Sequence, residues 1–178
     1  MGECCAGIDL SVKKPSGLAI ICDNKLAHLE LIVKDDDILR VLKSFNTRVV
    51  AIDAPLTLPR RGYMRVVDVE MHRRGFRVLP PLWRGMKPLT LRGIELAKRL
   101  ESEGMEVIET HPTSALKSSY CASKEELIEK VLGIKVRGVT SDEVDAIICA
   151  IVALMYSKGR YTSVKAPDGT IILLPRIC

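Results

Sequence analysis

The stretch TSDEVDAIICAIVALMYSKG, residues 140–159, decides the fold of this chain. Its centre is apolar on nearly every face, which is typical of a helix buried in a core. Thr140 and Glu143 have the spacing of a capping box, so the helix is predicted to begin at Thr140. Asp142 and Asp145 follow in its first turns, about 60° apart on one face. The helix must therefore pack against other elements of the fold, and two carboxylates lie at its start.

Apolar runs elsewhere in the chain predict the sheet that would cover this helix. Three of them, at residues 4–11, 16–23 and 25–33, are typical of strands. Asp23 and Asn24 separate the second run from the third, and both residue types tolerate the positive φ of a tight hairpin turn. We therefore expect a three-stranded antiparallel meander at the start of the chain.

A helix and a fourth strand are predicted after the meander. Residues 35–46 place apolar side chains near helical spacing behind three aspartates, which favour a helix N-terminus. Residues 47–55 form an apolar run of the kind that is buried on both faces, and Pro55 ends it. A helix between two strands usually forms a right-handed crossover. We therefore expect this strand to run parallel to one in the meander, with the first strand as its neighbour.

The remaining patterns are mostly helical. They predict helices at residues 64–74, 89–104 and 123–133, a strand at 105–112, and a last short strand after the turn at Asp168. The order of elements predicts a mixed α/β fold with helices on both faces of a central sheet.

Length and composition favour one domain spanning residues 1–178. The chain is 47% hydrophobic, enough for a sizeable core, and it contains no repeat or low-complexity run. Its longest apolar run, residues 146–156, is too short to cross a bilayer, and its first ten residues lack the pattern of a signal peptide. We expect a soluble cytoplasmic protein with no membrane partner.

The six cysteines include no pair spaced as Cys-x-x-Cys and no histidine at a zinc-ligand spacing. Several of them lie inside apolar runs, where a thiol packs like a small hydrophobic side chain. We expect reduced, buried thiols rather than disulfides.

Positive charge is concentrated in the middle of the chain. Residues 60–92 contain nine Lys or Arg and two acids, a net charge of +7, whereas the whole chain carries +5, which leaves −2 for the remainder. Tyr63, Phe76 and Trp83 are interleaved with these cations, a mixture suited to phosphate contacts and base stacking. A solvated basic loop and helix would have the same composition, so both interpretations stay open. Under the first, the predicted phosphate contacts are Arg65, Arg84 and Lys87.

Three predicted strands each carry one acid near the carboxyl end: Asp9 in GIDLS, Asp53 in AIDAP and Glu109 in VIETHP. A carboxylate inside a buried strand costs several kcal/mol unless it is paired or bound to a metal. If the three strands are adjacent and parallel, their carboxyl ends converge at one edge of the sheet. Each acid alone has a simpler explanation, as a turn cap or as the partner of an arginine. For Glu109 that explanation is as good as the functional one.

Asp142 and Asp145 can point at the same edge from the closing helix. Asp142 is also explained by its place in the first turn, where an acid favours the helix dipole, whereas Asp145 is followed only by apolar residues. Four or five carboxylates without His or Cys form a hard oxygen site of the type that binds Mg²⁺ or Mn²⁺. Two such ions can activate water and stabilise the leaving oxygen of a phosphodiester. The predicted metal ligands are Asp9, Asp53, Asp142 and Asp145, and Glu109 joins them in the predicted catalytic set.

The motifs GIDLS, AIDAP and DEVDAIICA resemble, in order and spacing, those of the ribonuclease H-like superfamily, especially its Holliday-junction resolvase branch. Over nearly the whole chain, the sequence also resembles the predicted nucleases of domain-of-unknown-function family 429. This second resemblance includes RVVDVEMHRRG, GMKPLTLRGIELAKRL, VIETHP and PDGTIILLP. Resolvases usually have Glu on the fourth strand, where this chain has Asp53.

The resemblance implies a ribonuclease H-like fold, with a five-stranded mixed sheet of order 3-2-1-4-5 and a C-terminal β extension. It also implies a divalent-metal nuclease site at Asp9, Asp53 and Asp142 or Asp145, with Glu109 as a neighbouring acid. The leading hypothesis is therefore a Mg²⁺- or Mn²⁺-dependent nuclease acting on DNA or RNA. The oligomeric state is left open, with a homodimer among the options.

Two other functions are compatible with the sequence. One is a catalytically inactive module of the same fold that binds nucleic acid or protein through the basic segment. The other is a phosphotransferase of the actin-like fold, which shares the same core. That fold needs glycine-rich phosphate-binding turns, and the segments that follow Asp9 and Asp53 lack paired glycines.

Overall fold

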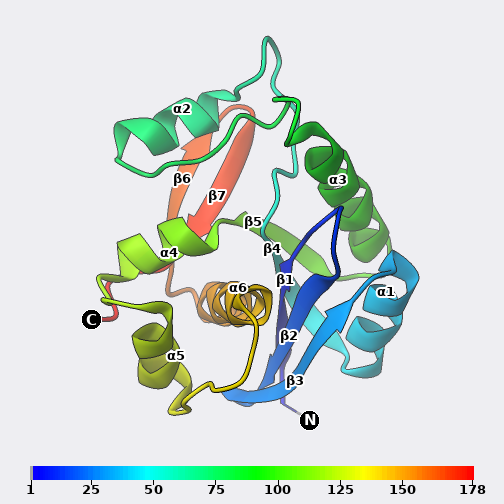
Figure 1. Ribbon diagram of the computed structural model, residues 1–178, viewed down its shortest axis with the longest axis vertical. Coiled ribbons are helices and arrows are strands. Elements are labelled where there is room, and N and C mark those ends of the chain that lie inside the picture. The colour runs from blue at the N-terminus through cyan, green and yellow to red at the C-terminus, as the bar shows by residue number, and fades with distance from the viewer. Residues whose placement is uncertain (1) are drawn as a thin grey trace.

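A seven-stranded mixed sheet forms the centre of the protein, in the order β3-β2-β1-β4-β5-β7-β6 (Figure 1). The computed structural model describes residues 2–178. β1, β4, β5 and β7 are parallel to one another, and β2, β3 and β6 are antiparallel to their neighbours. The strands are β1 (Cys4–Asp9), β2 (Ser16–Cys22), β3 (Lys25–Ile32), β4 (Thr47–Ile52), β5 (Glu106–Thr110), β6 (Thr162–Ala166) and β7 (Gly169–Leu173).

Helices cover both faces of the sheet. α1 and α3 pack on one face, and α4, α5 and α6 pack on the other (Figure 1). α2 lies over the hairpin of β6 and β7. No helix within residues 2–178 is long and apolar enough to cross a membrane. The helices are α1 (Asp35–Ser44), α2 (Val66–Arg73), α3 (Lys87–Ser102), α4 (Pro112–Ser119), α5 (Lys124–Leu132) and α6 (Ser141–Ser157).

α6 lies directly on the backbone of β1 and β2 because glycine occupies two contact points. A Cβ on Gly7 would lie 2.0 Å from the amide nitrogen of Ala150, and a Cβ on Gly17 would lie 2.4 Å from the carbonyl oxygen of Asp142. Both distances are far below van der Waals contact, so a larger residue at either point would displace the helix. The two glycines therefore set the distance of α6 from the sheet.

Most of the predicted elements are confirmed. The turn between β2 and β3 has Asp23 and Asn24 at φ of 52° and 61°. β4 runs parallel to β1, as the crossover rule predicts. The Thr140 side chain accepts a hydrogen bond from the Glu143 N–H, and the Glu143 carboxylate accepts one from the Thr140 N–H, so the predicted capping box is present.

The predicted number of strands in the sheet, five, is wrong. The order 3-2-1-4-5 is present, but the C-terminal segment forms a hairpin that extends the same sheet to seven strands. β7 joins β5 through two residue pairs, Glu109 with Ile171 and Thr110 with Ile172. The sequence pattern predicts neither β6, in which Val164 is the buried residue, nor α4, which begins at Pro112 after a strand signal.

Four of the six cysteines form disulfides, contrary to the expectation of reduced thiols. Cys4 is bonded to Cys22 across β1 and β2, and Cys121 is bonded to the C-terminal Cys178. Cys5 and Cys149 are buried free thiols. The first pair is created by strand register, which spacing along the chain does not reveal. Disulfides are common in oxidising compartments, so the cytoplasmic location stays a prediction that the cysteines do not support.

Substitution of Gly7 tests the packing of α6. We expect Gly7→Ala to lower the free energy of unfolding by about 1–3 kcal/mol, because the added methyl group overlaps the backbone of α6. For a chain of this size the melting temperature would fall by about 2–4 °C per kcal/mol. Gly85→Ala is the control, since a Cβ at Gly85 meets nothing within 4 Å. A fall in melting temperature no larger than that of the control would show that α6 does not rest on Gly7.

Candidate active site

Strand register brings Asp9 and Asp53 side by side at the carboxyl edge of the sheet. Ile8 pairs with Ile52, and the Asp53 N–H donates to the Ile8 carbonyl oxygen at 2.9 Å. Ile8 and Ile52 point into the core beneath α1 and α3. Because side chains alternate along a strand, the next residue on each strand points to the α6 face. Asp9 and Asp53 therefore meet on that face.

The start of α6 adds two carboxylates at the same place. Gly17 is the strand partner of Asp9, and the Asp142 carbonyl group lies directly over Gly17. Asp145, one turn further along α6, acts electrostatically on both Asp9 and Asp53. The structure thus brings the four predicted metal ligands together from β1, the end of β4 and α6.

The four carboxylates repel one another. The pKa of Asp9 is raised to about 7, because burial disfavours its charged form and because Asp145 and Asp142 repel it. The pKa of Asp53 is raised well above its usual range, first by burial and then by the charges of Asp9 and Asp145. A bound proton relieves part of this repulsion, and a bound cation would relieve it in the same way.

Two lysines partly compensate the carboxylates of α6. The Lys14 Nζ lies 2.7 Å from Asp142 Oδ1, but the Lys14 side chain is 58% exposed, so this ion pair is weak. Lys124 forms an ion pair with Asp145 in which the side chains are 27% and 23% exposed. Neither lysine is predicted from the sequence, because each meets its partner only through the packing of α6 against distant segments.

The oxygen atoms of the four aspartates are spread more widely than in a closed cation site. Within residues 2–178, no three of these aspartates each offer an oxygen atom such that all three atoms lie within 4.8 Å of one another. The donor set, four carboxylates with no sulfur or nitrogen, nevertheless matches the ligands that Mg²⁺ and Mn²⁺ prefer. A cation would have to draw the carboxylates closer and compete with Lys14 and Lys124.

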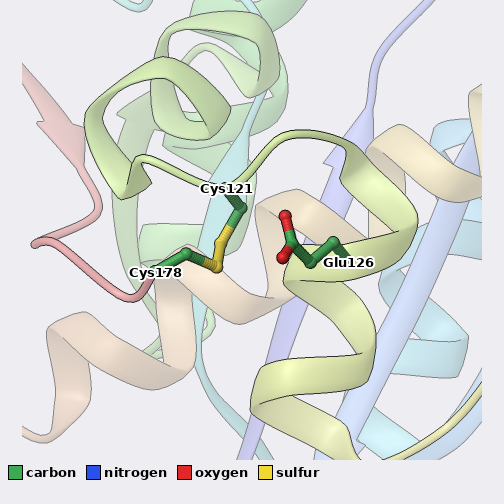
Figure 2. Close-up of side chains that lie close together, drawn as sticks. All are labelled: Cys121, Glu126 and Cys178. Atoms are coloured by element: carbon green, nitrogen blue, oxygen red, sulfur yellow. A yellow bond between two sulfur atoms is a disulfide. The ribbon is translucent and has the colours of Figure 1, made fainter.

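A second group of potential metal ligands contains two sulfur atoms that are bonded to each other. Cys121, Glu126 and Cys178 lie within 4.8 Å of one another, but the two sulfur atoms form a disulfide (Figure 2). The Glu126 carboxylate accepts a hydrogen bond from the Ala122 N–H at 2.6 Å, so it stabilises the start of α5. With its sulfur atoms bonded to each other, this group offers no thiolate to a metal.

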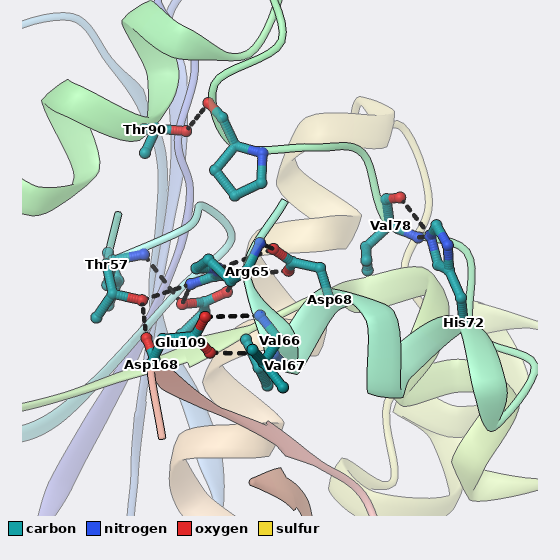
Figure 3. A network of polar contacts seen from close by, with 12 residues as sticks. Thr57, Arg65, Val66, Val67, Asp68, His72, Val78, Thr90, Glu109 and Asp168 are labelled. Atoms are coloured by element: carbon teal, nitrogen blue, oxygen red, sulfur yellow. Dashed lines mark hydrogen bonds and ion pairs between the residues drawn. The ribbon is translucent and has the colours of Figure 1, made fainter. Parts of the chain in front are cut away.

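Glu109 lines the same cavity as Asp9 and Asp53, but its carboxylate is paired with Arg65. Glu109 pairs with Ile52 in the sheet, so its side chain points to the face opposite Asp53. Its carboxylate accepts hydrogen bonds from the Arg65 guanidinium at 2.6 and 2.8 Å and from the Leu56 N–H at 3.0 Å (Figure 3). The structure therefore gives Glu109 the structural role that the sequence left open.

Arg65 is 1% exposed, so the structure places it in the interior and not at the surface where a phosphate contact was expected. Its guanidinium donates to both Glu109 and Asp68 (Figure 3). Such a bidentate pairing with carboxylates is the geometry that arginine favours when buried. The guanidinium is thus committed to two internal acids.

The network around Arg65 connects three distant segments. Asp168, in the turn between β6 and β7, accepts hydrogen bonds from the Val66 and Val67 N–H groups at 2.6 and 3.1 Å and so caps α2 (Figure 3). Thr57 donates to the Asp168 carbonyl oxygen at 2.7 Å and accepts from Arg65 at 2.9 Å. These contacts fix α2 and the segment before it relative to the C-terminal hairpin.

A cavity of about 260 Å³ adjoins the aspartate cluster. Its charged lining comes from Asp9 and Asp53 at the strand ends and from the network of Arg65, Asp68 and Glu109. Its apolar wall includes Val78, Leu79, Met86 and Leu89. Arg84 and Lys87, the other predicted phosphate contacts, are exposed in the same stretch of chain, at residues 78–89. The cavity thus lies between the carboxylates and the basic segment.

His111 is a further residue of the site that the sequence analysis does not select. It follows β5 directly and lines the cavity. Its Nδ1 lies 2.7 Å from Ser114 Oγ. Burial lowers the pKa of His111 while Asp145 opposes that shift, so the imidazole is mainly neutral at pH 7. Its position immediately after a strand was the available signal, and a neutral imidazole there can accept a proton.

Comparison with known proteins supports the fold. No protein-family model matches the chain and no curated protein sequence is significantly similar to it, so membership of family 429 is not confirmed. Among solved structures, the chain is similar to T. thermophilus RuvC in complex with Holliday junction substrate, with a TM-score of 0.59 and 19% sequence identity. The match covers 88% of this chain and 96% of that chain. The two proteins share an α/β fold with a mixed central sheet.

The raised pKa of Asp9 predicts how stability varies with pH in the absence of metal. In the unfolded chain Asp9 loses its proton near pH 4, whereas in the folded protein it keeps it up to about pH 7. The folded state therefore binds more protons between these values, and this group makes stability fall as the pH rises from about 4 to 7. We expect Asp9→Asn, in EDTA, to melt a few degrees above the natural protein at pH 8 but close to it at pH 4.

Asp36→Asn is the control for this experiment, since the Asp36 side chain is 82% exposed and pairs with Arg99, not with a residue of the cluster. A difference in melting temperature between Asp9→Asn and the natural protein that does not change with pH would contradict the assignment.

The role of Arg65 can be separated from phosphate binding by unfolding in denaturant. We expect Arg65→Met to lower the free energy of unfolding by about 3–5 kcal/mol, because it leaves two buried carboxylates without a counter-ion. Arg84→Met, at an exposed arginine, should change it by no more than about 0.5 kcal/mol. Equal stability of the two variants would show that the network is not structural.

Proposed function

We propose that this protein is a divalent-metal-dependent nuclease that hydrolyses phosphodiester bonds in DNA or RNA. The observation that carries the proposal is the meeting of Asp9, Asp53, Asp142 and Asp145 at one edge of the sheet, where burial and then the charges of Asp145 and Asp142 raise the pKa of Asp9 to about 7. Such a concentration of partly buried negative charge is a functional-site signature when it lies beside a cavity.

The fold adds support of a weaker kind. One similar solved structure is that of RuvC in complex with a Holliday junction substrate. Fold similarity at 19% identity does not carry function with it. The proposal therefore depends on the chemistry of the carboxylates and the basic segment, with the fold as consistent background.

Asp9, Asp53 and Asp145 are the residues that would hold the metal, with Asp9 between the other two, and Asp142 would orient a ligand or water. When bound, Mg²⁺ or Mn²⁺ would supply an activated water and neutralise charge on the phosphate. Lys14 and Lys124 would balance Asp142 and Asp145 while the site is empty of metal. The cluster thereby avoids the full cost of its own repulsion in the folded protein.

The residues around the carboxylates complete the proposed site. Arg84 and Lys87 are exposed next to the cavity wall and would hold the nucleic-acid backbone. His111, neutral and at the cavity, would accept or return a proton near Asp145. The apolar wall of the cavity would limit access of bulk water.

One observation favours a second function, that of a nucleic-acid-binding protein without catalysis. Lys14 and Lys124 already pair with Asp142 and Asp145, and within residues 2–178 no three aspartates of the cluster bring one oxygen atom each within 4.8 Å of one another. Under this alternative the lysines are permanent counter-ions, and the protein binds nucleic acid with no uptake of metal.

Cleavage assays with Mn²⁺ or Mg²⁺ test the proposal. Branched DNA, duplex DNA and an RNA:DNA hybrid would be offered as substrates, and at least one should be cut. We expect Asp9→Asn, Asp53→Asn and Asp145→Asn each to lower the rate by about 100-fold or more, because each removes a ligand worth several kcal/mol in the transition state. Asp142→Asn should have a smaller effect.

Asp36→Asn serves again as the control, with an expected rate close to that of the natural protein. Calorimetric titration with Mn²⁺ in parallel separates the two functions. Cleavage at an unchanged rate in Asp9→Asn and Asp145→Asn would contradict the proposed nuclease site. Binding of nucleic acid without uptake of metal would favour the non-catalytic alternative.

A further inference from the structure

Two large aromatic side chains are exposed in segments that contribute other residues to the cavity wall. Trp83, at 53% exposure, lies in the loop of residues 78–86, which we call the rim loop, and Tyr63, at 67%, lies in the segment before α2. The Leu82 N–H donates to the Tyr63 carbonyl oxygen at 3.2 Å, so the two segments touch next to both aromatics. They form the connections of α2 to β4 and to α3 in Figure 1.

The rim loop is held in place by its own hydrogen bonds. His72 Nε2 lies 2.8 Å from the Val78 carbonyl oxygen, and the Thr90 hydroxyl donates to the Pro81 carbonyl oxygen at 2.8 Å (Figure 3). Within the loop, the Trp83 N–H donates to the Pro80 carbonyl oxygen at 3.1 Å. These hydrogen bonds satisfy backbone groups of the rim loop within the protein and so fix the loop in the conformation in which Trp83 is exposed.

Uncompensated positive charge surrounds the two aromatics. The cations in question are Arg60, Arg61, Arg84 and Lys87, all of them exposed. In the part of the chain that the structure describes, none of them forms an ion pair, because the acids of this segment, Asp68 and Glu70, pair with other arginines. The exposed rings of Trp83 and Tyr63 are therefore surrounded by positive charge.

The rim loop also forms part of the wall of the cavity. Leu79 and Met86, on either side of Trp83 in the chain, line the cavity together with Asp9 and Asp53. A polymer that binds to the rim loop would therefore lie close to the aspartate cluster.

We propose that Trp83 and Tyr63 form a stacking platform for unpaired bases, so that the substrate is a nucleic acid with a single-stranded segment. This inference rests on the proposed nuclease function and specifies its substrate. Every unpaired base offers a π-face to an exposed aromatic ring, and base–aromatic stacking contributes strongly to single-strand binding. The four surrounding cations hold the phosphates between stacked bases.

Duplex nucleic acid fits this surface less well. Its bases are already stacked on one another, so it presents phosphates to the cations but no base face to Trp83 or Tyr63. An acidic protein segment would satisfy the charge in the same way and leave the aromatic faces with less to gain. The combination of exposed rings and unpaired cations is what selects the single strand.

Intrinsic fluorescence tests the platform directly, because the chain contains one tryptophan, Trp83. The natural protein in EDTA, where no metal-dependent cleavage occurs, would be titrated with oligothymidylate of about twelve nucleotides and with a blunt-ended DNA hairpin of equal charge, whose loop is a non-nucleotide linker so that it has no unpaired base. We expect strong quenching by the oligothymidylate and little by the hairpin stem. Quenching of the same strength by both, by neither, or by an acidic peptide would overturn the proposal.

Variants measured by fluorescence anisotropy of labelled DNA supply the second arm. Trp83→Ala and Tyr63→Ala should each weaken oligothymidylate binding about tenfold and hairpin binding less than about twofold, and Trp83→Phe should retain most of the affinity. Tyr120→Ala is the matched control, since Tyr120 is 69% exposed at the end of α4, outside the rim. Circular dichroism confirms that each variant is folded.

Equal losses for both ligands, or no loss in Trp83→Ala, would refute stacking. Because binding is measured without metal, a failure of cleavage leaves this result standing, and a failure of stacking leaves the nuclease assay standing.

Discussion

The close contact of α6 with the backbone of β1 and β2 is the constraint on which the rest of the structure depends. A helix that lies on side chains can slide or tilt by small amounts, but one that lies on Gly7 and Gly17 has no such freedom, since its own backbone atoms are the contact. The N-terminus of α6 is thereby fixed over the strand pair formed by Gly17 and Asp9. The same glycines that bury the helix thus deliver Asp142 and Asp145 to the end of β1.

Placing four carboxylates next to one another has an electrostatic cost, which the protein offsets only in part. Asp9 and Asp53 are raised in pKa by burial and by their neighbours, while Asp142 and Asp145 each have a lysine at hand. If stability were the only requirement, apolar residues at these positions would serve better than four repelling acids. The proposed cation would supply, at the edge of the cavity, the positive charge that the two lysines supply only in part.

Much of this could be predicted from the sequence, because caps, turns and apolar runs are local signals. The capping box at Thr140 and the turn at Asp23 depend on neighbours in the chain, and the parallel pairing of β4 with β1 follows from the general handedness rule for a strand–helix–strand unit. The errors concern the face of the sheet to which a strand residue points and the pairing of distant segments. Asp53 follows Ile52, whereas Glu109 pairs with Ile52, so a shift of one residue along β5 sends its acid to the other face. The disulfides and the joining of β7 to β5 depend on contacts between distant segments, which local patterns do not encode.

The pairing of Glu109 with Arg65 accounts for the interior position of both residues. On the α3 face of the sheet, one arginine faces two acids, and the charges of this network are hydrogen-bonded to one another even though the network lines the cavity. On the α6 face, the carboxylates outnumber the lysines that reach them. A ligand shifts an equilibrium only where it finds an interaction that the free protein lacks. The saturated network around Arg65 therefore serves to position α2 and the segments on either side of it, and the unsaturated cluster across the sheet is where a cation would bind.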